Sequence, residues 1–156
     1  MLGWQFLWRA KVPPKVKSLA WRACQEAIPV SCNVRRRGLS ISTLCMHCGL
    51  EQEDGFHVLL RCLFSRQVWA LLCLPWRWIN FAEGTTEDWM RSVWKELKGA
   101  DFSLFLLICW NLWWSRNQLA FEEVALLPWD IVVSARRLLL ISHKDPMVTD
   151  PLKDSC

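Results

Sequence analysis

The chain has 156 residues, 53% of them hydrophobic, with twelve tryptophans, eight cysteines and no tyrosine. This length suits one domain or two small subdomains, and the apolar content excludes a largely disordered chain. The longest apolar stretch, residues 102–114, falls short of the ~18–20 residues that span a bilayer. The N-terminus shows no pattern of a cleavable signal segment. We therefore expect an intracellular protein, in the nucleus or cytoplasm, that is neither secreted nor bound to a membrane.

The net charge of +4 is unevenly distributed along the chain. Residues 1–40 carry eight basic side chains and one acidic side chain, a balance of +7, whereas residues 41–156 carry eleven and fourteen, a balance of −3. A basic N-terminal quarter predicts either contact with phosphate or another acidic surface, or a solvated helix face. The cations that we consider for nucleic-acid binding are Lys11, Lys15, Lys17, Arg22, Arg35, Arg36 and Arg37.

The first predicted elements precede residue 30. Trp4 and Trp8 are four residues apart, so they would share one face of a helical turn and cap the core. Pro14 is well placed in the first turn of the next helix. Apolar residues then recur at helical spacing over residues 15–28, and Pro29 is expected to end that helix.

Two further helical segments follow in the first half. Ser31 is expected to cap a short helix over residues 32–37, which Gly38 closes in the left-handed conformation. A helical turn beginning at residue 54 or 55 is then expected to run into an apolar stripe that continues to Leu72.

The second half is rich in tryptophan. Most of the twelve tryptophans of the chain lie at helical spacing, which favours places in the core. The segment Thr85-x-x-Asp88 resembles a capping box, and Gly99 would end the helix that follows. Loop 75–84, with Trp76 and Trp78, separates this half from the first. Its helices are expected over 87–98, 102–121 and 128–141, followed by a flexible tail over 143–156.

Four residues with metal-binding side chains fall within 18 positions, at a Cys-x2-Cys-x8-His-x4-Cys spacing. One pair can hold one side of a tetrahedral ion, and the second pair can hold the other. Four sulfur and nitrogen ligands leave no open position for water, which is typical of structural rather than catalytic zinc. In an intracellular chain this spacing also favours a metal over disulfides. We predict one structural Zn²⁺ held by Cys45, Cys48, His57 and Cys62.

The remaining histidines and cysteines are less suited to this site. His47 is a possible rival ligand, but it lies inside the tight turn between the first two cysteines and would strain it. His143 is expected to be a bystander in the tail. The cysteines within apolar helical patterns are expected to be small buried hydrophobic residues; they are Cys24, Cys32, Cys73 and Cys109.

Several segments resemble the zinc-binding domain of plant non-LTR retrotransposon reverse transcriptases. The resemblance begins with Trp8-Arg9-Ala10-Lys11-Val12-Pro13-Pro14-Lys15-Val16-Lys17 and Trp21-Arg22-Ala23. It continues with Ile28-Pro29-Val30, Arg36-Arg37-Gly38-Leu39, the four ligands, Glu53 and Val68-Trp69. Val30 stands where Thr is common, and Leu63 stands where Pro is frequent. Residues 110–117 and Phe121 resemble a later segment that leads towards a ribonuclease H domain in these elements.

Apolar spacing is helical through most of the chain and no segment reads as a convincing strand. We therefore expect an all-α fold: a small helical domain with a Cys-Cys-His-Cys zinc knuckle and little or no β structure. We divide the chain into a zinc-binding domain (1–74), a Trp-rich helical extension (75–142) and the tail (143–156). The family resemblance implies a retroelement polyprotein as the source of the chain, and RNA or DNA as a partner.

We expect a non-catalytic module without a small-molecule substrate. The chain lacks the Asp-Asp pair of a polymerase and a recognisable carboxylate cluster of a hydrolase, and its Ser, His and carboxylate residues are too scattered for a catalytic triad. Two alternatives stay open at this point. The chain could be a structural or protein-docking module between polymerase and ribonuclease H domains, or a non-functional relic fragment.

Overall fold

The structure is a computed structural model, and it describes residues 3–74 and 84–144. Within these ranges it is helical and contains no named strand, which confirms the all-α prediction; two residues form one isolated antiparallel bridge, Leu44 with Gln52. None of the described helices is long and apolar enough to cross a membrane. The helices are α1 Gln5–Trp8, α2 Pro14–Cys24, α3 Ser31–Arg36, the π-helix η1 His57–Arg61, α4 Leu63–Ala70, α5 Thr86–Glu96, α6 Ala100–Glu122 and α7 Pro128–Lys144.

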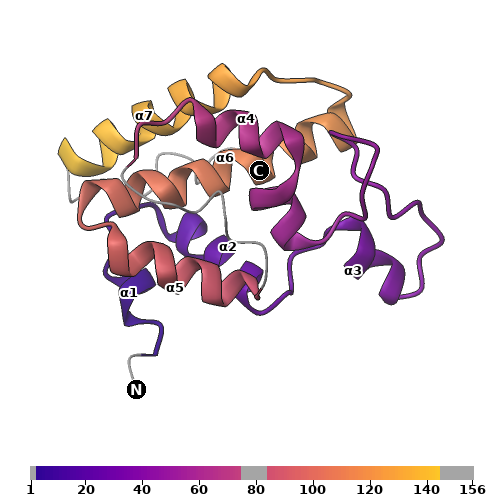
Figure 1. Ribbon diagram of the computed structural model, residues 1–156, viewed down its shortest axis with the longest axis horizontal. Coiled ribbons are helices and arrows are strands. Elements are labelled where there is room, and N and C mark those ends of the chain that lie inside the picture. The colour runs from indigo at the N-terminus through magenta and orange to yellow at the C-terminus, as the bar shows by residue number, and fades with distance from the viewer. Residues whose placement is uncertain (1–2, 75–83, 145–156) are drawn as a thin grey trace.

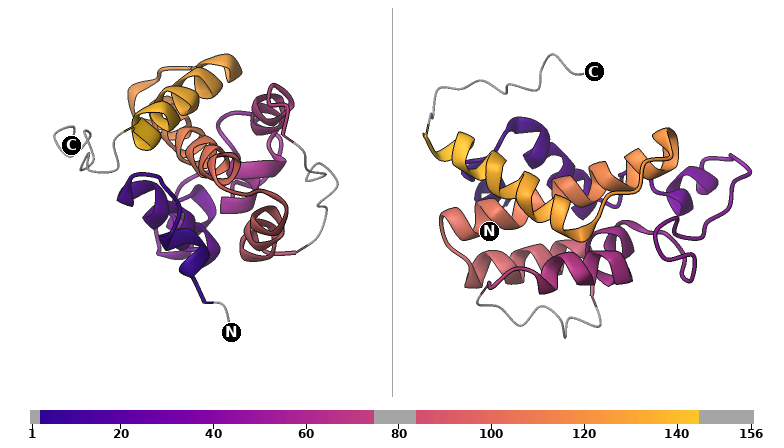
Figure 2. Two further views of the ribbon diagram at one scale, coloured as in Figure 1. Left: turned by 90° about the vertical axis from the view of Figure 1, so that its left-hand side faces the viewer. Right: turned by 90° about the horizontal axis from the view of Figure 1, so that it is seen from above.

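Helix α6 forms the centre of the bundle (Figure 1). Its 23 residues are apolar on nearly all sides, and 13 of them are buried, so neighbours must cover it all round. Helices α2 and α7 and the π-helix η1 pack against it, and the end-on view shows them surrounding it (Figure 2). The loops between α3 and η1 extend from one end of this bundle (Figures 1 and 2).

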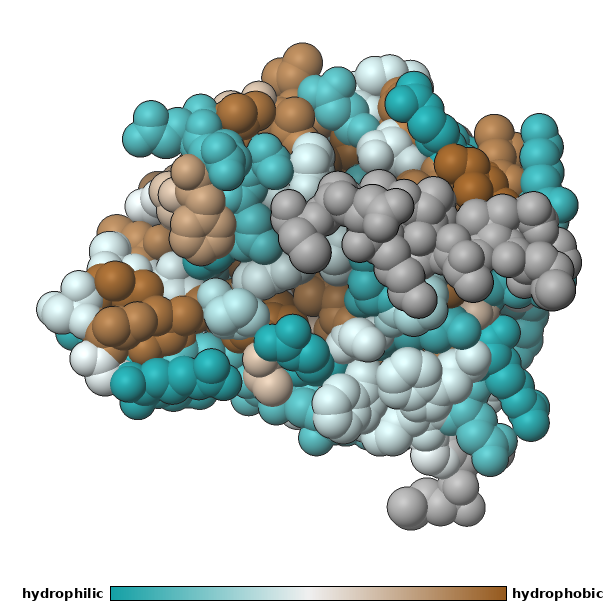
Figure 3. Space-filling view, turned by 180° about the vertical axis from the view of Figure 1, so that it is seen from behind, coloured by the Kyte–Doolittle hydropathy of each residue, from teal (hydrophilic) through white to brown (hydrophobic). Residues whose placement is uncertain are grey.

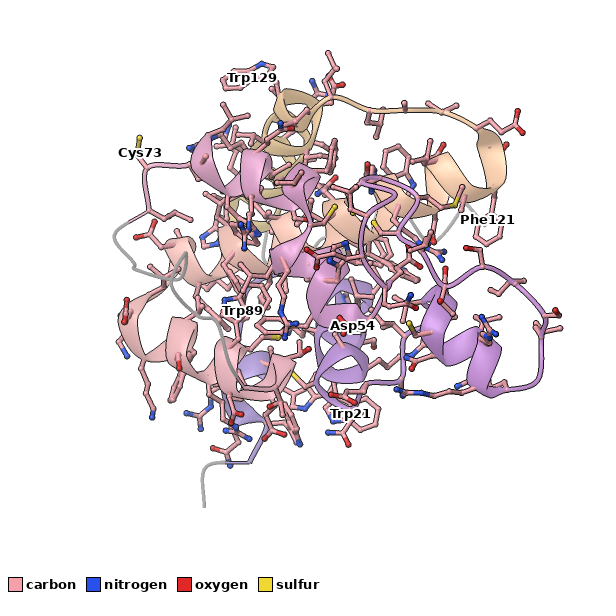
Figure 4. The ribbon with its side chains drawn as sticks, turned by 45° about the vertical axis from the view of Figure 1, so that its right-hand side comes forward. Trp21, Asp54, Cys73, Trp89, Phe121 and Trp129 are labelled. Atoms are coloured by element: carbon pink, nitrogen blue, oxygen red, sulfur yellow. The ribbon has the colours of Figure 1, made fainter. Side chains whose placement is uncertain are left out.

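Aromatic rings fill the middle of the core. The ring centroids of Trp89 and Phe105 are 5.1 Å apart, and those of Trp69 and Phe105 are 5.4 Å apart. Trp89 lies in the interior of the molecule (Figure 4). The expectation that tryptophans belong to the core is confirmed for Trp69 and Trp89. Trp8 and Trp129, however, are 48% and 60% exposed.

The first predicted helix boundaries need two corrections. Helix α2 ends at Cys24 rather than at residue 28, because Glu26 adopts a left-handed conformation (φ 53°). The amide of Ala27 then donates to the Arg22 carbonyl at 2.8 Å, which closes the helix end. Ser31 is the first residue of α3 and makes no capping bond there, because its hydroxyl donates instead to the buried Glu53.

The predicted helix from residue 54 to Leu72 is interrupted. Cys62 has an extended ψ of 140°, which separates η1 from α4. The apolar pattern continues across this break, so periodicity alone could not show it.

The later boundaries agree more closely with the prediction. Thr85 and Asp88 form the predicted capping box at the start of α5. Helix α7 runs to Lys144, so the tail does not begin at residue 143. Loop residues 75–83, with Trp76 and Trp78, and tail residues 145–156 lie outside the described part. The division into domains stays a prediction; one core cluster contains residues from both sides of position 75.

Candidate metal centre

Cys45 and Cys48 lie in a short hairpin-like segment of residues 43–53, the hairpin. Its two sides are joined by backbone hydrogen bonds from Cys45 to the Glu51 carbonyl (2.8 Å) and from Glu53 to the Thr43 carbonyl (2.7 Å). At the turn, the Gly49 amide donates to the Cys45 carbonyl at 2.7 Å. Gly49 has a φ of 64°, a conformation that residues with a side chain rarely adopt. This turn places the thiols of Cys45 and Cys48 side by side.

The second pair of ligands lies on either side of the π-helix. The Asp54 carboxylate accepts a hydrogen bond from the His57 amide at 2.7 Å, as an N-terminal cap does. The Cys62 amide then donates to the His57 carbonyl at 2.9 Å, five residues back along the chain. Downstream, the Trp69 indole donates to the Leu59 carbonyl at 2.8 Å and anchors the π-helix to α4. The wide turn explains how His and Cys five positions apart can face the same point.

All four ligand atoms lie within 4.8 Å of one another, and three of the four residues are buried. The sulfurs of Cys45 and Cys62 are 3.8 Å apart, and the Cys48 sulfur is 3.4 Å from Nε2 of His57. A tetrahedral ion with sulfur at ~2.3 Å and nitrogen at ~2.0–2.1 Å separates these atoms by about 3.8 Å and about 3.5 Å. A disulfide would instead need ~2.05 Å between sulfurs. The donor set and its spacing therefore fit zinc.

The pKa values of three of these side chains reflect how close the groups lie to one another. The hydrogen bond with Cys62, together with burial, raises the pKa of Cys45 to about 12, whereas the same hydrogen bond lowers the pKa of Cys62. Burial alone would lower the pKa of His57, but hydrogen bonds with Cys45 and Cys48 raise it to about 9. Zinc needs deprotonated ligands, so binding releases protons from this cluster.

The second nitrogen of His57 faces a carboxylate. Nδ1 lies 3.3 Å from Oε2 of Glu51, and it is a buried atom that makes no hydrogen bond within the described part of the chain. A carboxylate near the distal nitrogen of a ligating histidine is common at zinc sites, because it orients the ring. Nε2 is thereby left facing the three sulfurs.

His47 does not belong to the cluster. Its ring stacks on Phe64, with centroids 4.2 Å apart and planes 5° from parallel, and its Nε2 lies 3.4 Å from the Ser115 hydroxyl. Burial lowers its pKa. His47 thus connects the cysteine turn to α4 and α6. The histidine predicted to be a bystander, His143, lies in the last turn of α7.

A buried ion pair that the sequence did not reveal lies beside the hairpin. Glu53 is fully buried, and its Oε1 accepts hydrogen bonds from Arg116 (2.6 and 3.1 Å) and from the amide and hydroxyl of Ser31 (both 2.8 Å). Burial alone would raise the pKa of Glu53, but the bonds from Arg116 and Ser31 hold it below its usual value. The pair joins the hairpin to α6. Glu53 and Arg116 both lie in segments that resemble the family, and this resemblance was the only sign in the sequence that the two residues matter.

The candidate nucleic-acid cations fall into two groups. Two are partly buried: Lys17 donates to the Trp8 carbonyl at 2.9 Å, and the ammonium of Lys15 lies 4.8 Å from the Trp110 ring centroid. The others are exposed, and three of them are consecutive at the end of α3 beside the hairpin; these exposed residues are Lys11, Arg22, Arg35, Arg36 and Arg37. Arg22 and Arg36 also donate locally, to the Ala27 carbonyl at 3.5 Å and to the Asn33 side chain at 3.4 Å.

The remaining cysteines differ from one another. Cys24 and Cys109 are buried, as predicted. Burial raises the pKa of Cys24 to about 12, and its thiol donates to the Met90 sulfur at 3.4 Å. The prediction is wrong for Cys73, which is exposed and projects from the end of α4 (Figure 4), and Cys32 is partly exposed.

Comparisons with known proteins agree with the site. Residues 2–69 match a protein family described as zinc-binding in reverse transcriptase, which confirms the resemblance seen in the sequence. The chain is also 26% identical, over 111 residues, to a putative ribonuclease H protein of Arabidopsis thaliana. That alignment covers 69% of this chain but only 18% of the relative. No solved structure matches the chain.

Proposed function

We propose that this chain, whose residues 2–69 match a zinc-binding domain of the reverse-transcriptase type, is a non-catalytic module of retroelement origin that holds one structural zinc ion and contacts nucleic acid. One observation supports the metal assignment above all: the ligand atoms of Cys45, Cys48, His57 and Cys62 lie within 4.8 Å of one another. Four protein ligands would close the coordination shell. A closed shell supports a structural rather than a catalytic ion.

The role of the ion would be to fix the hairpin against the helices. Cys45 and Cys48 come from the hairpin, and His57 and Cys62 come from the two ends of the π-helix. Zinc would therefore crosslink segments that share few apolar contacts. The side chains around the turn are solvent-exposed, with Leu50 at 71% and Met46 at 49%.

Metal analysis of the purified chain tests this proposal. We expect about one zinc per chain, and loss of that zinc in the double variant Cys45→Ser/Cys48→Ser. The matched control is Cys73→Ser, which removes an exposed thiol outside the cluster and should keep the zinc. A wild-type protein without stoichiometric zinc, or a double variant that retains it, would remove the proposal.

Nucleic-acid contact is supported by the exposed arginines at the end of α3, next to the hairpin. Arg35, Arg36 and Arg37 form no ion pair with any residue of the described part. Clustered cations give salt-dependent affinity for phosphate.

Filter binding of single-stranded RNA and DNA at increasing salt concentration tests this contact, with charge reversal of the three arginines as the variant. No binding at low salt, or binding that the reversal leaves unchanged, would exclude this surface.

A second candidate function is docking of another protein domain. Large apolar side chains are exposed around the connection between α6 and α7, with Phe121 at 74%, Leu127 at 68% and Trp129 at 60%. Phe121 and Trp129 project away from the body of the molecule (Figure 4). From behind, hydrophobic side chains form separate patches between hydrophilic ones (Figure 3). Self-association that Leu127→Ser and Trp129→Ser abolish, with no affinity for single-stranded RNA, would favour docking.

A further inference from the structure

A cavity of about 310 Å³ lies away from the metal ligands, where the N-terminal segment meets the α5–α6 junction and the end of α7. Its volume is near the lower limit of the roughly 300–1,000 Å³ typical of small-molecule sites. The residues that line it come from three separate stretches of the chain, which are residues 5–11, residues 94–103 and His143.

Aromatic rings form the wall of this cavity. The ring centroid of Phe6 lies 5.3 Å from that of Trp94 and 6.1 Å from that of Phe102. Phe6 and Phe102 are nearly fully buried, whereas Trp94 is partly exposed. A partly exposed indole supported by buried rings is a rigid surface on which a flat aromatic ligand can pack.

The rim of the cavity is basic. Arg9, Lys11 and Lys98 line it and are exposed, and no carboxylate is among the lining residues. None of the three forms an ion pair with another described residue. Lys98 lies beside the aromatic wall, with its ammonium 5.2 Å from the Trp94 ring centroid. The three cations at this opening are therefore not engaged in ion pairs within the described part of the chain.

We propose that this cavity binds one unpaired nucleotide of a single-stranded nucleic acid. The base would pack against Trp94 and Phe6, and the flanking phosphates would contact Lys98, Lys11 and Arg9. Aromatic stacking combined with phosphate contacts is the usual chemistry of single-strand binding. The volume admits one nucleotide rather than a longer segment. This inference rests on the proposed nucleic-acid function and adds a binding site to it, separate from the α3 arginines.

Calorimetric titration of the full zinc-loaded chain at low salt tests the inference. The probes are octauridylate, octathymidylate, an abasic octamer with the same phosphates, and inorganic phosphate. We expect both octamers with bases to bind about tenfold more tightly than the abasic octamer, since stacking depends on the base. Tighter binding of the ribo- or the deoxyribo-octamer would assign RNA or DNA as the ligand.

Two variants and a matched control locate the site. Lys98→Glu should weaken octamer binding by about tenfold and lower the salt dependence, and Trp94→Leu should remove the preference for bases over the abasic octamer. Lys95→Glu is the control: it changes an exposed lysine of α5, three residues before Lys98, that does not line the cavity. It should have a much smaller effect. Circular dichroism of each variant checks that the helices are intact.

The outcomes separate this inference from the function on which it rests. If the octamers bind but Lys98→Glu and Lys95→Glu weaken binding equally, or the abasic octamer binds as tightly, the cavity is not the site. If reversal of the α3 arginines then abolishes binding, the nucleic-acid proposal survives without the cavity. If no octamer binds at low salt, both proposals fail.

Discussion

The hairpin with its ligands and the helical bundle are held together in different ways. In the bundle, α6 is buried on nearly all sides and the aromatic core packs around Trp89 and Phe105. In the hairpin, Leu44, Met46 and Leu50 are 45–71% exposed, and the buried groups are chiefly the ligands and Glu53. Apolar burial can stabilise the bundle without metal, whereas the large apolar side chains of the hairpin stay exposed and add little burial. The same chain thus combines a hydrophobic domain with a segment whose order would depend on an ion.

Removal of zinc should produce the largest effect, and it should be local. In zinc-finger peptides the apparent metal-binding free energy is about 10–16 kcal/mol at neutral pH. We expect chelation to expose the amides of Cys45, Gly49 and Glu53 to hydrogen exchange, while α6 stays protected. Hydrogen exchange with mass spectrometry measures both regions in one experiment. Equal loss of protection in α6 would mean that the two regions are not stabilised separately.

Arg116→Met should have the next largest effect, because it leaves the buried Glu53 carboxylate without its partner. Breaking a buried ion pair in this way costs about 3–5 kcal/mol. The variant should also weaken zinc binding, because Glu53 holds one side of the hairpin. Chemical denaturation and a zinc competition titration measure the two effects. The double variant Arg116→Met/Glu53→Gln is the control, and it should recover part of the loss.

Leu106→Ala tests the bundle alone. Leu106 is fully buried in α6, and truncation of such a side chain costs about 2–5 kcal/mol. Zinc content of the folded protein should not change, since the residue lies outside the ligand cluster. Denaturation curves with and without chelator should shift by the same amount. A variant that folds but loses zinc would contradict the separation of the two regions.

The helical bundle could be predicted largely from the sequence, but the ion pair could not. The expected positions of α5, α6 and α7 follow from apolar periodicity, and the capping box of Thr85 and Asp88 was readable directly. Glu53 and Arg116 are 63 residues apart, and no local pattern pairs them. Such a contact depends on the tertiary packing that brings α6 next to the hairpin.

The four ligands were readable as a set, but the backbone that joins them was not. The break at Cys62 interrupts a continuous apolar pattern, because a ligand five residues after His57 requires a wider turn than an α-helix provides. The cavity beside Trp94 could not be predicted either, since it is assembled from three segments that are distant in sequence.

Acid should weaken the ion pair that connects the hairpin to the helical bundle. The folded-state pKa of Glu53 lies below its ordinary value of 4.5. Its ionised form therefore adds stability above the unfolded-state pKa, and this stability is lost as pH falls through the folded-state pKa. At matched zinc occupancy, the stability difference between wild type and Glu53→Gln, measured by chemical denaturation, should shrink as pH falls from the unfolded-state pKa of Glu53 through its folded-state pKa. A difference that is constant over this range would mean that Glu53 is not ionised in the fold.

Thr85→Ala should have the smallest effect. It removes the hydroxyl of the capping box at the start of α5, which accepts a hydrogen bond from the Asp88 amide at 3.1 Å and donates one to the Asp88 carboxylate at 2.9 Å. Loss of such a cap costs about 0.5–2 kcal/mol. Thermal melting measures the change, and zinc content should stay constant. Thr85→Ser, which keeps the hydroxyl, should retain most of the stability.

X-ray absorption at the zinc edge tests the central claim most directly, because it reports the atoms bound to the ion. Ligation by Cys45, Cys48, His57 and Cys62 predicts three sulfurs at ~2.3 Å and one nitrogen at ~2.0–2.1 Å. The variant His57→Ala should lose the nitrogen contribution of the imidazole and keep the sulfurs. A first shell with two sulfurs or fewer, or one dominated by oxygen, in the wild-type protein would contradict the account.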